Sequence, residues 1–187
     1  MDPGSNPGGA IMKLLLELHD EDIGLDSKKM KNPKTRDAAR AILLDGKKIA
    51  LLFVSKSKYH KLPGGGAEKG ENIHETLFRE VDEETGCKIK IVHEIGKIIE
   101  NRSHTNLIQT SYCYLAKKLE QHETRFEKDE IEDGFGLQWH DINSAIRMIE
   151  SEAKENYEKY ENNFIVRRDA KFLKAAKQII DLRHPGL

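Results

Sequence analysis

Apolar and polar residues alternate along this 187-residue chain in a way that predicts a mixture of strands and helices. Two apolar runs, residues 38–44 and 48–54, flank Asp45-Gly46, a dipeptide typical of a tight β-hairpin turn. Runs rich in β-branched and other apolar side chains predict further strands over residues 88–100, 107–116 and 137–139, and an edge strand over residues 12–18. Polar loops are expected over residues 19–34 and 101–106, with a longer charged loop over residues 117–136.

Helical periodicity follows the hairpin. One apolar stripe has three members, spaced four residues apart: Ile73, Leu77 and Val81. Asn72 is a good N-cap for this helix, and Glu75 is placed to complete a capping box. Gly86 favours the left-handed conformation that ends helices. Similar stripes predict a short helix after residue 141 and a longer one over residues 164–181.

A glycine-rich turn, Pro63-Gly64-Gly65-Gly66, comes directly before the first helix, and acidic residues occupy the opposite face of that helix. Glu80 and Glu84 are one turn apart, with Glu83 beside them. Like charges at this spacing cost an isolated helix roughly 0.2–0.5 kcal/mol per pair. Mg²⁺ binds carboxylates together with substrate phosphates, and a carbonyl of the turn can complete such a site. Spacing alone equally allows a solvated acidic face, because 34% of the residues are charged.

Residues 62–87 match a longer pattern, G-x5-E-x7-R-E-U-x-E-E-x-G-U, in which U is a bulky apolar residue. The fixed positions are filled, in order, by Gly65, Glu71, Arg79, Glu80, Val81, Glu83, Glu84, Gly86 and Cys87. The one departure is Cys87, and a buried thiol behaves as a small hydrophobe. This is the signature of the Nudix hydrolases, which the chain therefore resembles. The resemblance implies an α/β fold with a mixed β-sheet sandwiched between α-helices.

The resemblance also implies roles for the signature residues. Glu80, Glu83 and Glu84 are expected to bind Mg²⁺ or Mn²⁺, with the Gly65 carbonyl as a further ligand. Arg79 is expected to hold the neighbouring carboxylates through charge-assisted hydrogen bonds. Two residues are expected to have structural roles in the motif: Glu71 and Gly86.

A general base is needed to accept a proton from the attacking water. In Nudix hydrolases this base is a glutamate of the signature helix, here Glu80, or one from a downstream loop. In this chain the loop candidates are Glu130 and Glu132. The alternative for both is an ordinary solvated charge run.

Six residues outside the signature are candidates for substrate binding: Arg36, Arg40, Tyr59, His60, Arg102 and His104. The arginines of the first core strand can meet a phosphate, as in other Nudix enzymes, or simply face solvent. The aromatic side chains before the glycine turn can stack on a nucleobase or only pack. A histidine in a turn is most often solvated.

Composition places few further limits. The formal net charge is -1, which gives no general attraction to nucleic acid or to anionic membranes. No apolar run reaches the ~20 residues that span a bilayer. The two cysteines lack metal-ligand spacing and are expected to be reduced, so the cytoplasm is the expected compartment. Residues 1–10 read as a disordered or vector-derived end, and residues 11–187 as one domain that is a monomer or a homodimer.

The resemblance implies hydrolysis of a nucleoside diphosphate linked to another moiety. ADP-ribose-specific members carry a proline about fifteen residues after the signature, whereas this chain has none between Pro63 and Pro185. Dinucleoside polyphosphate hydrolases carry a tyrosine in a similar place, but the first one here, Tyr112, is further along the chain. The family's CoA and NADH pyrophosphatase motifs are not visible. By elimination the expected substrate is a nucleoside triphosphate, with oxidised forms such as 8-oxo-dGTP included. Two alternatives stay open: a non-catalytic module that senses nucleotides, and an enzyme that removes the 5′ pyrophosphate from RNA.

Overall fold

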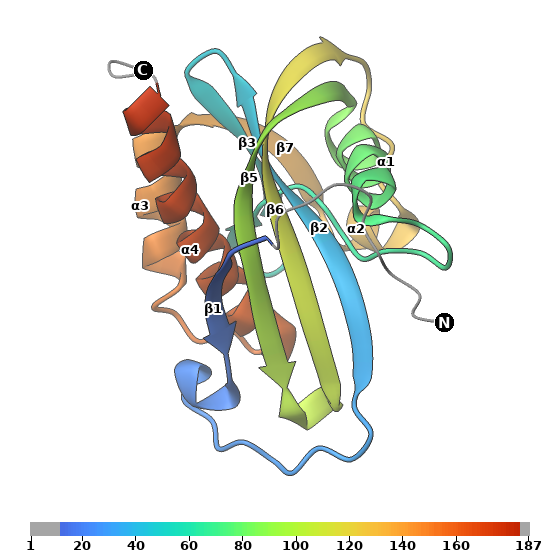
Figure 1. Cartoon of the computed structure of the whole chain (residues 1–187), viewed down its shortest axis with the longest axis vertical. Coiled ribbons are helices and arrows are strands. Elements are labelled where there is room, and N and C mark those ends of the chain that lie inside the picture. The colour runs from blue at the N-terminus through green and yellow to red at the C-terminus, as the bar shows by residue number, and fades with distance from the viewer. Residues whose placement is uncertain (1–11, 184–187) are drawn as a thin grey trace.

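The computed structural model describes residues 12–183 and contains a seven-stranded mixed sheet flanked by helices (Figure 1). The strands are β1 (Leu14–Leu18), β2 (Lys34–Asp45), β3 (Lys48–Val54), β4 (Tyr59–Lys61), β5 (Cys87–Arg102), β6 (Leu107–Gln121) and β7 (Phe135–Asp141). The helices are α1 (Ile73–Thr85), α2 (Lys128–Asp133), α3 (Ile142–Glu152) and α4 (Tyr160–Arg183), with 3₁₀ turns η1 (Asp20–Ile23) and η2 (Ser103–Thr105). The residues predicted to be a disordered end, 1–10, lie outside the described part.

The sheet has the order β1-β5-β6-β2-β3-β4, and β7 pairs with β3. β5 and β6 form a long antiparallel hairpin, while β2 runs parallel to β6. The expected edge strand is present as β1, which pairs in parallel with β5. The predicted hairpin is also confirmed, but β2 and β3 pair only beside its turn, through Leu44–Ile49 and Asp45–Lys48.

Where β2 does not pair with β3, its edge forms hydrogen bonds with the glycine-rich turn. Ala41 N–H donates to the Pro63 carbonyl and Ala39 N–H to the Gly65 carbonyl, both at 2.9 Å. Gly64 has a φ of 129°. A Cβ there would lie 2.1 Å from the Ala39 carbonyl oxygen, so only glycine fits. The turn is therefore fixed in the gap between β2 and β3.

Helices cover both faces of the sheet, as Figure 1 shows. Alternate residues of β2 serve the two layers: Ala39, Ala41 and Leu43 pack in the cluster that includes α1, whereas Ile42 belongs to the cluster that includes α3 and α4. The period-2 alternation of a strand buried on both faces explains this division. The expected α/β/α sandwich is confirmed.

The local signals of α1 are also confirmed. The Asn72 side chain accepts from His74 N–H and Glu75 N–H, and the Glu75 carboxylate accepts from Asn72 N–H. Gly86 closes the helix in the left-handed region with a φ of 66°. Because these bonds satisfy the exposed groups of both helix ends, the signature helix has fixed limits.

Three connections differ from expectation. Residues 59–61 form β4, which pairs with β3, instead of only leading into the turn. The charged segment 117–136 is partly ordered, because β6 continues to Gln121 and α2 follows. The polar segment 19–34 contains η1. Short strands and single helical turns have too little periodicity to be seen in sequence.

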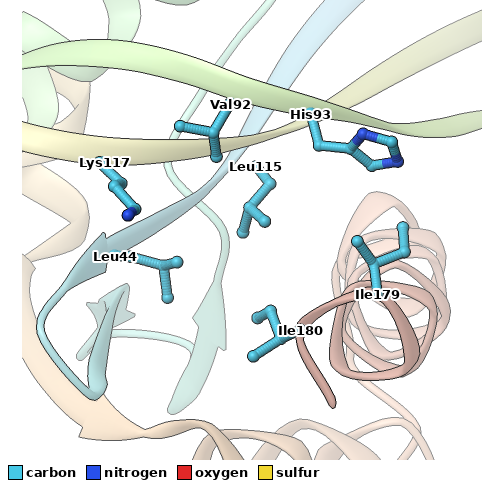
Figure 2. Close-up of a pocket in the computed structure, with 7 residues that line it drawn as sticks. All are labelled: Leu44, Val92, His93, Leu115, Lys117, Ile179 and Ile180. Atoms are coloured by element: carbon cyan, nitrogen blue, oxygen red, sulfur yellow. The ribbon is translucent and has the colours of Figure 1, made fainter. Parts of the chain in front are cut away.

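A small apolar pocket lies between the sheet and α4 (Figure 2). Its lining residues are Leu44, Val92, His93, Leu115, Lys117, Ile179 and Ile180. The pocket is on the α3/α4 face, whereas the signature helix packs on the other face. Within residues 12–183, no helix is long and apolar enough to cross a membrane.

Candidate active site

Arg79 is the hub of the signature residues. Its Nε and Nη2 atoms donate to the two oxygens of Glu71, at 2.7 and 3.0 Å. Its Nη1 donates to Glu80 Oε1 at 2.9 Å and to Glu83 Oε2 at 3.2 Å. Nη2 also donates to the Gly66 carbonyl at 3.2 Å. One guanidinium thus fixes three carboxylates of the motif to the glycine turn, in the forked geometry that arginine favours.

Glu71 braces the junction between the turn and α1. It accepts from Arg79, from Glu68 N–H and from the Thr76 hydroxyl. These hydrogen bonds, that of Arg79 first, lower the pKa of Glu71 to about 2. The carboxylate is therefore charged throughout the neutral range, as its expected structural role requires.

Glu84 is the buried member of the acidic set, with a side chain only 1% exposed. Its Oε1 accepts from Lys61 Nζ at 2.9 Å, and its Oε2 accepts from Gly64 N–H at 2.5 Å. An ammonium and a backbone amide together stabilise this charge away from water. Glu84 therefore links α1 to the end of β4 and to the turn.

Glu80 lies against the glycine turn. A Cβ added to Gly65 would be 2.2 Å from Glu80 Oε1, so the turn backbone can approach the carboxylate only because Gly65 lacks a side chain. Burial and the nearby charge of Glu84 raise the pKa of Glu80. The two carboxylates that the resemblance assigns to metal binding are thus brought together beside the turn.

The structure separates the two candidates of the downstream segment. The Glu130 carboxyl group lies within hydrogen-bonding reach of Glu84 on the signature helix, and burial together with this neighbouring charge raises the pKa of Glu130 to about 7. Glu132, in contrast, has a side chain that is 63% exposed and lies 3.9 Å from Lys128 of the same helix. Only Glu130 joins the acidic residues of α1.

The donor set suits a hard divalent cation, since it offers carboxylate oxygens of Glu80, Glu83 and Glu84 around a bare backbone turn. The Lys61 ammonium on Glu84 shows that this position attracts a cation. The described residues contain no group of three acidic, histidine or cysteine side chains already converging on one point. The Gly65 carbonyl accepts from Ala39 N–H and so retains one lone pair.

The two arginine candidates of β2 have different surroundings. Arg36 is exposed, and its guanidinium lies where a side chain on Gly66 would be, 2.1 Å from the position of its Cβ. Arg40 is buried and donates to its neighbour's carbonyl, Ala39 O, at 3.0 Å. Burial and the charge of Arg168 lower the pKa of Arg40 to about 10. Only Arg36 is brought to the surface of the glycine turn.

Tyr59 and His60 are core residues instead of stacking platforms. Tyr59 is 4% exposed and packs edge-on against Tyr157. His60 is 7% exposed; its Nδ1 lies 2.7 Å from Glu152 Oε1 and its Nε2 3.2 Å from Gln138 Oε1. Because β4 is a strand under α3, both side chains are enclosed, so neither presents a free face to a nucleobase.

Arg102 and His104 lie at the far end of the β5–β6 hairpin, away from α1 (Figure 1). Arg102 is buried and donates to Glu100 Oε1 at 2.7 Å. The His104 ring nitrogen Nε2 lies 3.0 Å from the Asp26 carbonyl oxygen. The structure gives both residues local partners and does not bring them to the candidate site.

Two residues of the site were not anticipated. Lys61 contacts Glu84, and its position directly before Leu62-Pro63-Gly64-Gly65 is the only sequence signal that could have indicated it. Asp82, at the unspecified position of the signature, accepts from His122 Nε2 and from Lys88 Nζ, both at 2.8 Å, and is paired with Arg125. Because His122 and Arg125 are about 40 residues away in sequence, no local pattern could have indicated this contact.

The comparisons with known proteins agree with this geometry. Residues 34–162 match the model of the NUDIX domain. The chain belongs to the Nudix family. Nudix hydrolases are pyrophosphohydrolases that act on phosphorus-containing anhydrides, so the resemblance stated from the signature is confirmed.

The individual relatives share only a modest part of their sequence with this chain. The chain is 31% identical over 132 residues to Nudix hydrolase 6 of Arabidopsis thaliana, a match that covers 66% of this chain and 45% of the relative. The chain thus spans less than half the length of that protein. A NUDIX hydrolase from Nitrosomonas europaea superposes with a TM-score of 0.58 at 14% identity, covering 78% of this chain and 90% of its own. A UDP-X diphosphatase gives 0.52 at 17% identity, covering 80% and 66%. At these identities the structures show the shared Nudix fold.

Proposed function

We propose that this protein is a Mg²⁺- or Mn²⁺-dependent hydrolase that cleaves a pyrophosphate bond in a nucleoside diphosphate linked to another moiety. The observation that carries the proposal is an array of three carboxylates beside the glycine turn. Arg79 holds Glu80 and Glu83, and Lys61 and the Gly64 N–H hold Glu84. Such carboxylates suit a divalent cation together with substrate phosphates. A complete signature also favours catalysis over a sensing role.

The residues that would hold the cation are Glu80, Glu83 and Glu84, with the Gly65 carbonyl as a further candidate. A bound divalent cation would neutralise phosphate charge and polarise water. Arg79 keeps the Glu80 and Glu83 carboxylates in place, and Glu71 fixes Arg79 in turn. The exposed Arg36 at the turn is placed to neutralise a further phosphate oxygen.

In the reaction, the oxygen of a water molecule attacks one phosphorus atom and the bridging P–O bond breaks. The proton of the water passes to a carboxylate, and the leaving phosphate departs with the bond electrons. We assign Glu130 as the carboxylate that accepts the proton, because it faces Glu84 while Glu132 points into solvent. Glu80 is the competing candidate, since it also lies beside Glu84.

A nucleoside triphosphate, canonical or oxidised like 8-oxo-dGTP, is the proposed substrate class. The support is the lack of the proline that marks ADP-ribose-specific relatives. The proposed compartment is the cytoplasm, because Cys87 and Cys113 are both buried free thiols, as a reducing compartment permits.

The test is a phosphate- and pyrophosphate-release panel with Mg²⁺ and Mn²⁺. It contains canonical and oxidised nucleoside triphosphates, dinucleoside polyphosphates, nucleotide sugars, ADP-ribose and 5′-triphosphorylated RNA. We expect a nucleoside triphosphate to be the best substrate and Glu84→Gln to lower its turnover at least about 100-fold. Glu68→Gln is the matched control, because Glu68 is exposed in the glycine-turn segment and contacts Glu71 through its backbone N–H and carbonyl.

Near-normal turnover in a folded Glu84→Gln variant would contradict the assignment of the site. Silence of the wild-type protein across the whole panel, with Mn²⁺ still bound, would favour the sensing module. A clear preference for triphosphorylated RNA would replace the proposed substrate class but leave the chemistry unchanged.

A further inference from the structure

Lys61 is the last residue of β4 and lies directly before the glycine turn. Its Nζ atom is 2.9 Å from Glu84 Oε1 and 4.6 Å from the centre of the Phe135 ring. The Lys61 side chain is 14% exposed and that of Glu84 is 1% exposed. The ammonium is therefore enclosed between a carboxylate and an aromatic face, an arrangement that fixes its position.

The Lys61–Glu84 pair uses the carboxylate that the proposed function assigns to the metal. Glu84 Oε1 faces Lys61 and Oε2 faces Gly64 N–H, so both oxygens already have partners. A divalent cation and an ammonium repel each other strongly at one carboxylate. Binding of the metal to Glu84 must therefore break or weaken the contact with Lys61.

The surroundings would retain the ammonium near the site after it leaves Glu84. Phe135 contacts the side chain from β7, and Glu130 lies close enough for the Lys61 charge to lower its pKa, against the larger effect of burial. Glu84 would hold the metal, and a bound metal would attract the substrate phosphates to the same carboxylates. A flexible lysine stem then allows its three donors to turn from Glu84 toward an anionic oxygen.

We propose that Lys61 is an internal counter-ion of Glu84 in the metal-free protein, that divalent cations displace it, and that it then binds a phosphate of the substrate. The inference rests on the proposed function, because it requires Glu84 to be a metal ligand. Lys61 would thereby lower the affinity for free metal and raise the affinity for phosphate once metal is bound.

The first experiment measures Mn²⁺ binding without nucleotide, from the electron paramagnetic resonance signal of free Mn²⁺. Lys61→Met is expected to bind Mn²⁺ about tenfold more tightly than the wild-type protein. Lys61→Arg keeps the charge and should resemble the wild type. Lys69→Met is the matched control, because it removes the same charge from an exposed position of the glycine-turn segment and should leave the Kd unchanged.

The second experiment measures binding of imidodiphosphate, a non-hydrolysable pyrophosphate analogue, at saturating Mn²⁺ by calorimetry. Lys61→Met should weaken this binding about tenfold, the loss expected for one charge-assisted hydrogen bond. Together, tighter metal and weaker phosphate binding in one variant distinguish this role from simple damage to the fold, which would weaken both.

A third measurement does not depend on a variant folding. In the wild-type protein, the ¹³Cε and ¹⁵Nζ resonances of Lys61 should move when Mg²⁺ is added, whereas those of Lys69 should stay. The inference is overturned if Lys61→Met binds Mn²⁺ no more tightly than the wild type and the wild-type Lys61 resonances do not shift when Mg²⁺ is added. If Glu84→Gln binds Mn²⁺ as the wild type does, the metal site itself is wrong and the role of Lys61 is overturned with it.

Discussion

The carboxylate of Asp82 on α1 accepts a hydrogen bond from His122 Nε2, 40 residues later in the chain, at 2.8 Å. Arg125 pairs with the same carboxylate, and its backbone N–H donates to the Glu83 carbonyl at 2.7 Å. The segment that leads from β6 to α2 is thus fixed to the outer side of the signature helix. Since Glu130 follows on α2, we expect Asp82 to position that carboxyl group.

Asp82→Ala should release this segment and move Glu130 away from Glu84. We expect kcat to fall about 10- to 100-fold, because a displacement of about 1 Å at a reacting group has effects of this size. Mn²⁺ affinity at α1 should change little. Hydrogen exchange of residues 122–133 should quicken, and Glu123→Gln, an exposed change in the same segment, should behave as the wild type. Unchanged exchange in Asp82→Ala would rule out the positioning role.

The two glutamates of α2 should respond differently to the loss of charge. Glu130→Gln should lower kcat about 100-fold or more, as expected for a general base, while Glu132→Gln should stay within about twofold of the wild type. Steady-state kinetics with the best substrate of the panel measure both. A large loss in Glu132→Gln, or none in Glu130→Gln, would move the base to Glu80.

Gly65 has no room for a side chain because of the Glu80 carboxylate. Gly65→Ala should push that carboxylate away, so Mn²⁺ binding and kcat should each fall about 10- to 100-fold. The cause is the contact at 2.2 Å and not backbone strain, because Gly65 does not have a positive φ. Gly136→Ala is the matched control, since a Cβ there meets no atom within 4 Å and Gly136 has no positive φ. Equal Mn²⁺ affinities in the two alanine variants would show that Glu80 is not held at the turn.

Glu100 should make the stability depend on pH. Burial alone raises the pKa of this carboxyl group, but Arg168 and Arg102 outweigh burial and hold the pKa at about 2. Because the folded pKa lies below the ordinary value of 4.5, the stabilisation is complete above pH 4.5 and is lost as the pH falls toward 2. The free energy of unfolding should therefore drop by about 2 kcal/mol between pH 6 and pH 3 from this group alone.

Urea unfolding at the two pH values checks this expectation. Glu100→Gln should be less stable by about 3–5 kcal/mol at pH 6, because Arg168 and Arg102 then lose a buried partner, and its stability should depend less on pH. Glu94→Gln, on the exposed side of the same strand, serves as the control. Identical pH dependence in Glu100→Gln and the wild type would contradict the prediction.

The sequence predicted those parts of the molecule that depend on local rules. The capping of α1 by Asn72, its end at Gly86 and the turn at Asp45-Gly46 each depend on a few neighbouring residues, and all are present. Three signature carboxylates, those of Glu71, Glu80 and Glu83, meet at Arg79 because they lie on one helix and the turn before it.

Contacts between distant segments could not be predicted in this way. Arg40 is buried near Arg168 and Asp169 of α4. Glu100, the partner of Arg102, is paired with Arg168 of α4 as well, so the sequence near the two arginines gave no indication of their burial. Tyr59 and His60 flank the turn in sequence, but β4 places them under α3. The choice between Glu130 and Glu132 depended on which side of a six-residue helix faces α1, and helical periodicity is too weak over that length to decide it.

One hydrogen bond shows that the structural support of the glycine turn includes α4. Leu62 N–H, just before the glycine turn, donates to Asp169 Oδ2 of α4 at 2.8 Å. The match to the NUDIX domain ends at residue 162, seven residues before that carboxylate. A protein shortened at this boundary would keep the whole signature but lose most of α4, including the Asp169 carboxylate that holds the residue before the glycine turn. A shortened form of this protein made for binding or activity measurements should therefore retain residues 163–183, because they support the glycine turn.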